Sequence, residues 1–196
     1  MNITFLGIGN VGSALADNLA KHGHTVMIAA RNPDSKTVKA AQAKNSNFLV
    51  KPVSEAIDAA EVVFLATPFA ANESALKSAG ELSGKILVDC TNPVGPGLSH
   101  GIQSTLSGAE SVQTLVQTAK VVKAFTIYGF ENFENTHYPG HTTKGKSLKP
   151  AVLIESDDAT AKSVVSQLCQ ELGWEAIDTG GTIYEPLLRT HDFAVD

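Results

Sequence analysis

Three glycines near the N-terminus have the spacing of a phosphate-binding loop. Gly7, Gly9 and Gly12 fit the pattern GxGxxG, between an apolar run over residues 2–7 and a helical pattern over residues 10–22. In that setting the first glycine permits a tight turn, the second lets the backbone approach a pyrophosphate, and the third lets the helix pack closely on the strand. The helix N-terminus adds N–H groups and a favourable dipole. The motif predicts a dinucleotide site; the alternative is a glycine turn in a fold that binds no nucleotide.

The residues after the next apolar run indicate which dinucleotide is bound. An NAD site places an Asp or Glu about 20 residues beyond the glycine motif, where it accepts hydrogen bonds from ribose hydroxyls. Here that place reads Ala29-Ala30-Arg31-Asn32. Arg31 has a fork of donors suited to a 2′-phosphate, Ser35 and Lys36 follow within reach, and Asp34 is predicted to cap the next helix. We therefore expect NADP(H); the other interpretation of Arg31 is a solvated arginine at a strand end.

Short apolar runs and helical patterns alternate along the whole chain. Runs that are apolar on both faces, such as residues 61–66, are typical of a parallel sheet covered by helices. We expect an α/β fold of the Rossmann type: a doubly wound, mainly parallel sheet with helices on both faces. The predicted strands are residues 2–7, 25–30, 48–50, 61–66, 85–88, 121–125, 151–155 and 174–177, and the predicted helices are residues 10–22, 35–44, 70–79, 111–118 and 159–172. Residues 128–149 show little periodicity and are predicted to form a loop.

Length and charge exclude several classes of protein. The chain has 196 residues, so we expect one domain, residues 1–196. Its part from about residue 126 to residue 196 is expected to cover the side of the dinucleotide site where a redox acceptor would bind. The formal net charge of −5 includes no basic block for nucleic acid or anionic lipid. No leader and no apolar stretch of membrane-spanning length is apparent, so we expect a cytoplasmic protein whose partner is a small-molecule redox acceptor rather than nucleic acid or a membrane.

The cysteines and histidines suggest no metal site. Cys90 and Cys169 are the two cysteines, and they lack CxxC spacing or surrounding histidines. We expect Cys90 to act as a small buried hydrophobe, and Trp174 to lie in the core. His22 and His24 flank a helix end at Gly23, where capping and surface roles are favoured over metal binding.

Five segments in order carry a family resemblance: GIGNVG at 7–12, AARNP at 29–33, ATP at 66–68, DCTNP at 89–93 and VVKAF at 121–125. Together they resemble the NADP oxidoreductases that depend on the deazaflavin coenzyme F420, and the related cytosolic domains of membrane metalloreductases. The likeness runs from Met1 to about Leu188. It implies a Rossmann-type fold, NADP(H) as cofactor, and a deazaflavin or flavin as co-substrate.

The resemblance also implies roles for individual residues. The pyrophosphate would lie on residues 8–12 and the 2′-phosphate on Arg31 with Ser35, although Ala30 stands where the deazaflavin enzymes have a serine. Thr67 and Pro68 would lie beside the ribose. Asn92, Pro93, Ala124 and Phe125 would lie near the nicotinamide. The full set of predicted cofactor-binding residues is Gly7, Ile8, Gly9, Asn10, Val11, Gly12, Arg31, Asn32, Ser35, Lys36, Ala66, Thr67, Pro68, Asn92, Pro93, Ala124 and Phe125.

The end of the chain departs from the family pattern. Family members continue with a longer apolar helix after the segment that resembles residues 184–187, whereas this sequence reaches Asp196 through polar residues. We expect either a more open acceptor side or one that a second copy completes, as in a homodimer.

The sequence singles out no catalytic acid or base. Hydride transfer between a nicotinamide and a flavin-like ring mainly requires that the two reactive carbons be held close together with water excluded. A ketone or imine reductase would need a proton donor near the nicotinamide, for which Lys123, Tyr128, His137 and His141 are candidates; Lys123 is predicted to point away from the face of Ala124.

Three functions remain open at this stage. The first is an NADP(H)-dependent oxidoreductase that transfers hydride to or from a deazaflavin, flavin or similar planar acceptor. The second is an NADP(H)-binding sensor module, and the third is a reductase of a small carbonyl or imine substrate that uses Tyr128 or His141.

Overall fold

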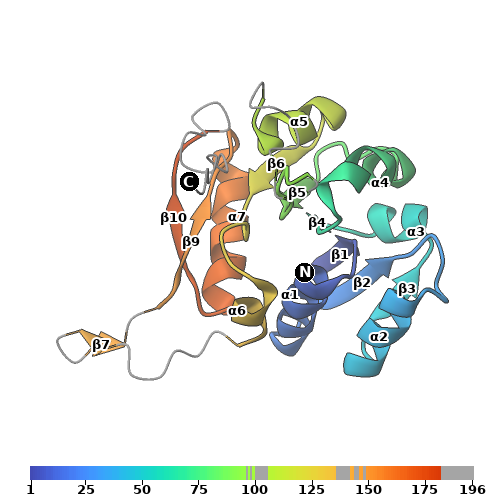
Figure 1. The fold of residues 1–196 in the computed structure, drawn as a ribbon, viewed down its shortest axis with the longest axis horizontal. Coiled ribbons are helices and arrows are strands. Elements are labelled where there is room, and N and C mark those ends of the chain that lie inside the picture. The colour runs from blue at the N-terminus through green and yellow to red at the C-terminus, as the bar shows by residue number, and fades with distance from the viewer. Residues whose placement is uncertain are drawn as a thin grey trace.

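The fold is built around a six-stranded parallel sheet with the strand order β3-β2-β1-β4-β5-β6 (Figure 1). The computed structural model describes residues 1–95, 97, 99, 106–135, 142–143, 146–147 and 149–181. This strand order, which reverses direction beside β1, is that of a Rossmann fold. The strands of the sheet are β1 (Asn2–Leu6), β2 (Thr25–Ala29), β3 (Leu49–Lys51), β4 (Val62–Leu65), β5 (Ile86–Asp89) and β6 (Lys120–Lys123).

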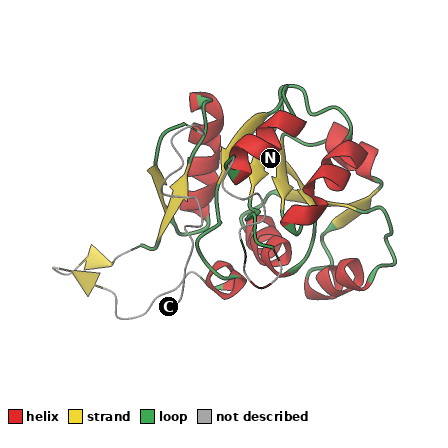
Figure 2. Ribbon diagram, turned by 45° about the horizontal axis from the view of Figure 1, so that its top comes forward, coloured by secondary structure: helices red, strands yellow, loops and turns green. Residues whose placement is uncertain are grey.

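Helices cover both faces of this sheet (Figure 2). Alternate residues of β4 divide between two buried clusters: Val62 and Phe64 pack with residues of α1, α2 and α7, and Val63 and Leu65 pack with residues of α3, α4 and α5. Both faces of the strand are therefore buried, which confirms the predicted doubly wound fold. The helices are α1 (Asn10–Lys21), α2 (Lys36–Lys44), α3 (Val53–Asp58), the 3₁₀ turn η1 (Phe69–Ala71), α4 (Asn72–Ala79), α5 (Gly108–Leu115), α6 (Phe130–Glu134) and α7 (Ala159–Glu171).

A second, smaller sheet adjoins the β6 edge. Its strands β9 (Ala151–Ile154) and β10 (Glu175–Asp178) pair in parallel, and backbone hydrogen bonds of 2.8 and 3.2 Å join Lys123 to Glu155 in antiparallel fashion. Trp174, which directly precedes β10, is fully buried, as predicted. The remaining strands are β7 (Thr142–Thr143) and β8 (Lys146–Ser147).

Helix α3 (Val53–Asp58) was not predicted, and two further segments differ from their predictions. The helix predicted at residues 111–118 begins at Gly108, because Ser107 and Glu110 form a capping box in which each side chain accepts from the other's backbone N–H, at 3.0 and 2.7 Å. The segment predicted as a loop from residue 128 to residue 149 contains α6, which packs against α1. Within the described part of the chain, no helix combines the length and apolarity needed to cross a bilayer.

Candidate dinucleotide-binding site

The glycine motif forms the turn between β1 and α1. Gly7 has a φ of 92°, and a Cβ there would lie 2.6 Å from the carbonyl oxygen of Ala66. A Cβ on Gly12 would collide with the carbonyl oxygen of Gly7 and would lie 3.3 Å from the Cβ of Ala66. These two glycines therefore let α1 approach the ends of β1 and β4.

Gly9 has a different environment from the other two glycines. It is the N-cap residue of α1, where no side chain caps the helix, and a Cβ built on it would meet nothing within 4 Å. The first N–H groups of α1 are thus not covered by a capping side chain, as a site for a phosphate requires.

A hollow of about 300 Å³ opens beside this turn, at the carboxyl ends of β1, β2 and β4. It brings together six of the predicted cofactor-binding residues: Gly7, Ile8, Arg31, Asn32, Ser35 and Thr67. Arg31 is exposed, and among the lining residues it is the one that carries a formal charge. The hollow is therefore positive at the end of β2, where an NAD site would be negative.

The N-terminus of α2 lies at the same hollow. Ser35 is its N-cap residue, and its hydroxyl accepts a hydrogen bond of 3.4 Å from the N–H of Val38. The prediction that Asp34 caps this helix is wrong, because the Asp34 carboxylate lies 3.0 Å from the ammonium of Lys39 and is well exposed. Thr37 also lines the hollow, with its hydroxyl 3.4 Å from that of Ser35.

A second hollow, of about 230 Å³, adjoins the first along the glycine turn. Ile8 and Thr37 line both, and Gly9 and Asn10 line the second. Its outer wall includes an ion pair of 2.6 Å between Lys44 of α2 and Glu134 of α6, which joins these helices. The residues of the two hollows that the sequence analysis missed include Ser13, Thr37 and Lys44.

Other predicted cofactor-binding residues line neither hollow. Val11, Gly12 and Ala66 shape the packing beneath the glycine turn, and Lys36 is an exposed residue in the first turn of α2. Pro68 is exposed and precedes η1.

The four residues predicted near the nicotinamide lie at the carboxyl ends of β5 and β6. Asn92 donates a hydrogen bond of 2.8 Å from its Nδ2 to the carbonyl oxygen of Thr126, so the two loops are joined. Phe125 has a φ of 60°, a left-handed backbone that a bulky residue rarely adopts. Pro93, Ala124 and Phe125 are buried, and all four residues line neither hollow.

Neither described candidate for a proton donor lines either of these two hollows. The ammonium of Lys123 is buried and binds the carboxylate of Asp89 at 2.8 Å, on the face of β6 opposite to Val122 and Ala124, as predicted. The ring of Tyr128 packs against Trp174, with 4.9 Å between the centroids. His137 and His141 lie outside the described residues.

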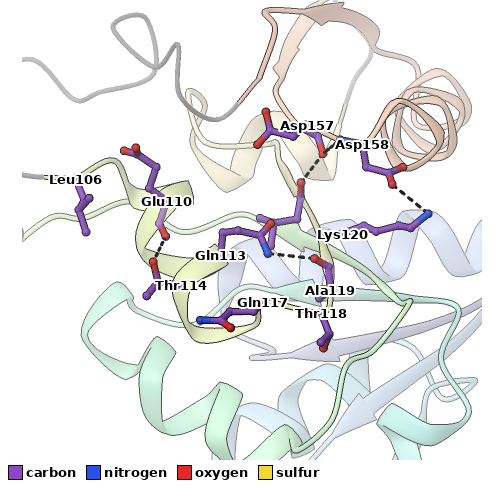
Figure 3. A pocket seen from close by; sticks show the side chains of 12 residues that line it. Leu106, Glu110, Gln113, Thr114, Gln117, Thr118, Ala119, Lys120, Asp157 and Asp158 are labelled. Carbon is purple, nitrogen blue, oxygen red and sulfur yellow. Dashed lines mark hydrogen bonds and ion pairs between the residues drawn. The ribbon is translucent and has the colours of Figure 1, made fainter.

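A larger hollow, of about 750 Å³, lies at the other end of β6, between α5 and the start of α7 (Figure 3). Several of its polar side chains are engaged with neighbours: Lys120 pairs with Asp158 at 3.1 Å, and the Gln113 amide donates to the carbonyl oxygen of Ala119 at 3.1 Å. It contains no predicted cofactor-binding residue. Among the side chains that the structure describes, no cluster of three or more potential metal ligands occurs.

Comparisons with known proteins agree with the geometry of the glycine turn. Residues 2–93 match the family model of the NADP oxidoreductases that are coenzyme F420-dependent. The metalloreductase STEAP3 of Rattus norvegicus is 31% identical over 179 residues, which cover 91% of this chain and 33% of the rat protein. The chain thus spans about one third of the length of that relative.

Solved structures extend the likeness over most of the chain. A crystal structure assigned as an F420-dependent NADP-reductase from Arthrobacter sp. FB24 has a TM-score of 0.80 and 30% identity, and the match covers 93% of this chain and 86% of that one. A hypothetical protein from Sinorhizobium meliloti shares the fold, with a TM-score of 0.83 at 23% identity over 97% of this chain and 91% of that one. The match to residues 2–93 and the likeness to the Arthrobacter protein show that this chain belongs to the coenzyme F420-dependent NADP oxidoreductase family.

Proposed function

We propose that the chain binds NADP(H) along the carboxyl edge of the sheet and transfers hydride between the nicotinamide and a planar acceptor, a deazaflavin or a flavin. The observation that carries this proposal is the hollow that joins the glycine turn to Arg31 after β2 and to Ser35 at the N-terminus of α2. The family's NADP-dependent chemistry and the match to an F420-dependent NADP-reductase support the choice of acceptor.

Binding follows from the groups that face the hollow. The open N-terminus of α1 at Gly9 suits the pyrophosphate, and Arg31 with the hydroxyls of Ser35 and Thr37 suits the 2′-phosphate. The lining includes no carboxylate that would repel this phosphate. NADPH should therefore be preferred over NADH.

The protein's part in the reaction would be to position the two rings and exclude water. Bound NADP(H) supplies or receives the hydride. Among the described residues near the ends of β5 and β6, Lys123 is committed to Asp89 and the Tyr128 ring packs against Trp174. The ring of a deazaflavin or flavin can accept a hydride without a proton from a protein side chain, whereas a ketone or imine needs a proton donor. Such a site therefore suits a deazaflavin or flavin better.

Turnover with defined acceptors tests this proposal. We would follow NADPH oxidation with a deazaflavin, FMN, FAD and a ferric chelate, each with an NADH control, in the native chain, Arg31→Ala and Lys39→Ala. We expect turnover with a planar acceptor. The KM for NADPH should rise about tenfold or more in Arg31→Ala and should stay unchanged in Lys39→Ala. Lys39 is the control because it lies on α2 outside the hollow. Tight NADPH binding without turnover on any acceptor would contradict the proposed reaction.

A further inference from the structure

A buried ion pair lies beneath the ends of β5 and β6. Asp89 and Lys123 are register partners on these adjacent strands, and their side chains are 0% and 1% exposed. The ammonium also donates to the carbonyl oxygen of Thr91, in the loop that leads to Asn92. An ion pair this deep gains little net stability, because desolvation of both charges offsets their attraction. The ion pair is therefore better explained by the loops and side chains that it holds in place than by a gain in stability.

The pair is one end of a hydrogen-bond network that leads to the first hollow. The Asp89 carboxylate accepts from the hydroxyl of Thr91 at 2.7 Å, and the Thr91 oxygen accepts from the amide of Asn72 at 2.8 Å. The side-chain amide oxygen of Asn72, Oδ1, accepts from the hydroxyl of Thr67 at 2.7 Å, and Thr67 lines the hollow. Four elements, β6, β5, α4 and the end of β4, thus share one network.

The ion pair fixes the donor and the acceptor of every hydrogen bond in this network. An ammonium can only donate and a carboxylate can only accept, so the Thr91 hydroxyl must donate to Asp89. Its oxygen is then free to accept from the Asn72 amide, which turns the Asn72 carbonyl toward Thr67. Thr67 must donate to that carbonyl, and its remaining lone pairs can accept. The hollow therefore presents at Thr67 an acceptor, suited to a ribose hydroxyl or an amide rather than a phosphate.

The same pair holds the loop after β5. Both the N–H of Thr91, which donates to Asp89 at 2.9 Å, and its carbonyl oxygen are bound by the pair. The next residue, Asn92, fixes the carbonyl oxygen of Thr126, directly after the strained Phe125. β5 lies three strand spacings from β2, about 14 Å, so this loop serves the half of the dinucleotide remote from Arg31.

We propose that Lys123 and Asp89 are positioning residues for the nicotinamide half of the bound dinucleotide, acting through Thr91 on the loop after β5. This inference rests on the proposed function. It assigns to Lys123 a role that requires no contact with the substrate.

The test compares two ligands in equilibrium binding. NADPH contains both halves of the dinucleotide, and adenosine 2′,5′-bisphosphate contains the half with the 2′-phosphate but no nicotinamide. The variant is the double substitution Lys123→Met with Asp89→Asn, which removes both charges and keeps the side-chain sizes similar. The matched control is Lys120→Met with Asp158→Asn, the same change at the other end of β6, where the ion pair is partly exposed.

We expect the Lys123–Asp89 double variant to bind NADPH about tenfold more weakly and adenosine 2′,5′-bisphosphate within about twofold of the native chain, while the control binds both normally. Equal weakening of both ligands, or no change in either, would overturn the positioning role. Arg31→Ala, included in the series, should weaken both ligands. If Arg31→Ala has no effect on either ligand, the proposed function fails first, and the inference with it.

A second variant tests the network without touching the ion pair. Thr67→Val removes the acceptor at the hollow and should weaken NADPH binding, and Thr67→Ser should restore it. Thr4→Val is the control, since it deletes an equally short buried hydroxyl bond, 2.7 Å to the carbonyl oxygen of Ala56, away from the network. Normal NADPH affinity in Thr67→Val, or failure of Thr67→Ser to restore it, would show that Thr67 is not part of the site.

Discussion

Cys90 and Cys169 lie in the hydrophobic core, and Cys169 belongs to α7. Burial raises the pKa of Cys169 to about 12. Burial, together with the neighbouring Asp89 carboxylate, raises the pKa of Cys90 well above its ordinary value. Because the thiolate is the reactive form, both thiols should be inert in the folded protein.

Thiol titration checks this prediction at pH 8. We expect a disulfide reagent to react with neither cysteine in the native chain and with both after unfolding in guanidinium, since the unfolded thiols regain an ordinary pKa. Rapid reaction of one thiol in the native protein would show that its burial is transient.

Site residues that belong to a local sequence pattern could be predicted from the sequence, whereas those brought to the site by packing could not. Gly7, Gly9 and Gly12 follow from one motif, and Arg31 follows from its place after the second strand. Lys44 lines the second hollow together with Glu134 of α6, its ion-pair partner, and the polar composition of that segment gives no sign of a helix. The link from Lys123 to Thr67 depends on pairings between distant strands, which no local spacing reveals.

At the scale of elements, the glycines of the turn between β1 and α1 have different roles: Gly12 is needed for packing, and Gly9 is expected to serve ligand binding. Gly12→Ala should lower the free energy of unfolding by about 1–3 kcal/mol, because its methyl group would press against the Gly7 carbonyl and Ala66. Gly9→Ala should change that free energy by less than about 1 kcal/mol, because its methyl group enters open space.

Urea unfolding and NADPH titration of both variants measure the two effects. Gly9→Ala should still weaken NADPH binding about tenfold or more, since the methyl group would occupy the place of the pyrophosphate. A Gly9→Ala variant with native affinity would mean that the pyrophosphate does not lie on this turn.

Element boundaries were predictable where side chains cap the helix. The sequence Ser107-Gly108-Ala109-Glu110 is a capping-box pattern that places the start of α5 correctly, whereas apolar periodicity alone placed the helix three residues too late. The strands of the large sheet were found within about one or two residues. For strands such as β4, the reason is that runs buried on both faces are strongly apolar.

At the scale of the whole molecule, a polar contact joins the N-terminal half to α7. His24, just before β2, lies 2.7 Å from the carboxylate of Glu171 at the end of α7. Burial raises the pKa of Glu171, but hydrogen bonds from His24 and Gln167 outweigh it, so its pKa lies below the ordinary value. Folding therefore favours the ionised carboxylate. The resulting stability is full above the unfolded pKa and is lost as the pH falls through the lowered folded pKa.

Glu171→Gln should accordingly lower the free energy of unfolding at pH 7, by at most about 1 kcal/mol for a partly exposed pair, and should have little effect at pH 3. Urea unfolding at the two pH values measures the difference. The control is Glu73→Gln, which removes a carboxylate paired with Lys77 on the exposed surface of α4. An equal loss at both pH values would show that Glu171 acts through packing rather than charge.

The most direct test of the account is equilibrium binding of NADPH and NADH to the native chain and to Arg31→Ala. If the hollow at the end of β2 holds a 2′-phosphate, the native chain binds NADPH at least about tenfold more tightly than NADH, and Arg31→Ala removes most of this preference while NADH binding stays unchanged. Equal affinity of the native chain for the two dinucleotides, or a preference that survives Arg31→Ala, would contradict the assignment of this hollow to NADP(H).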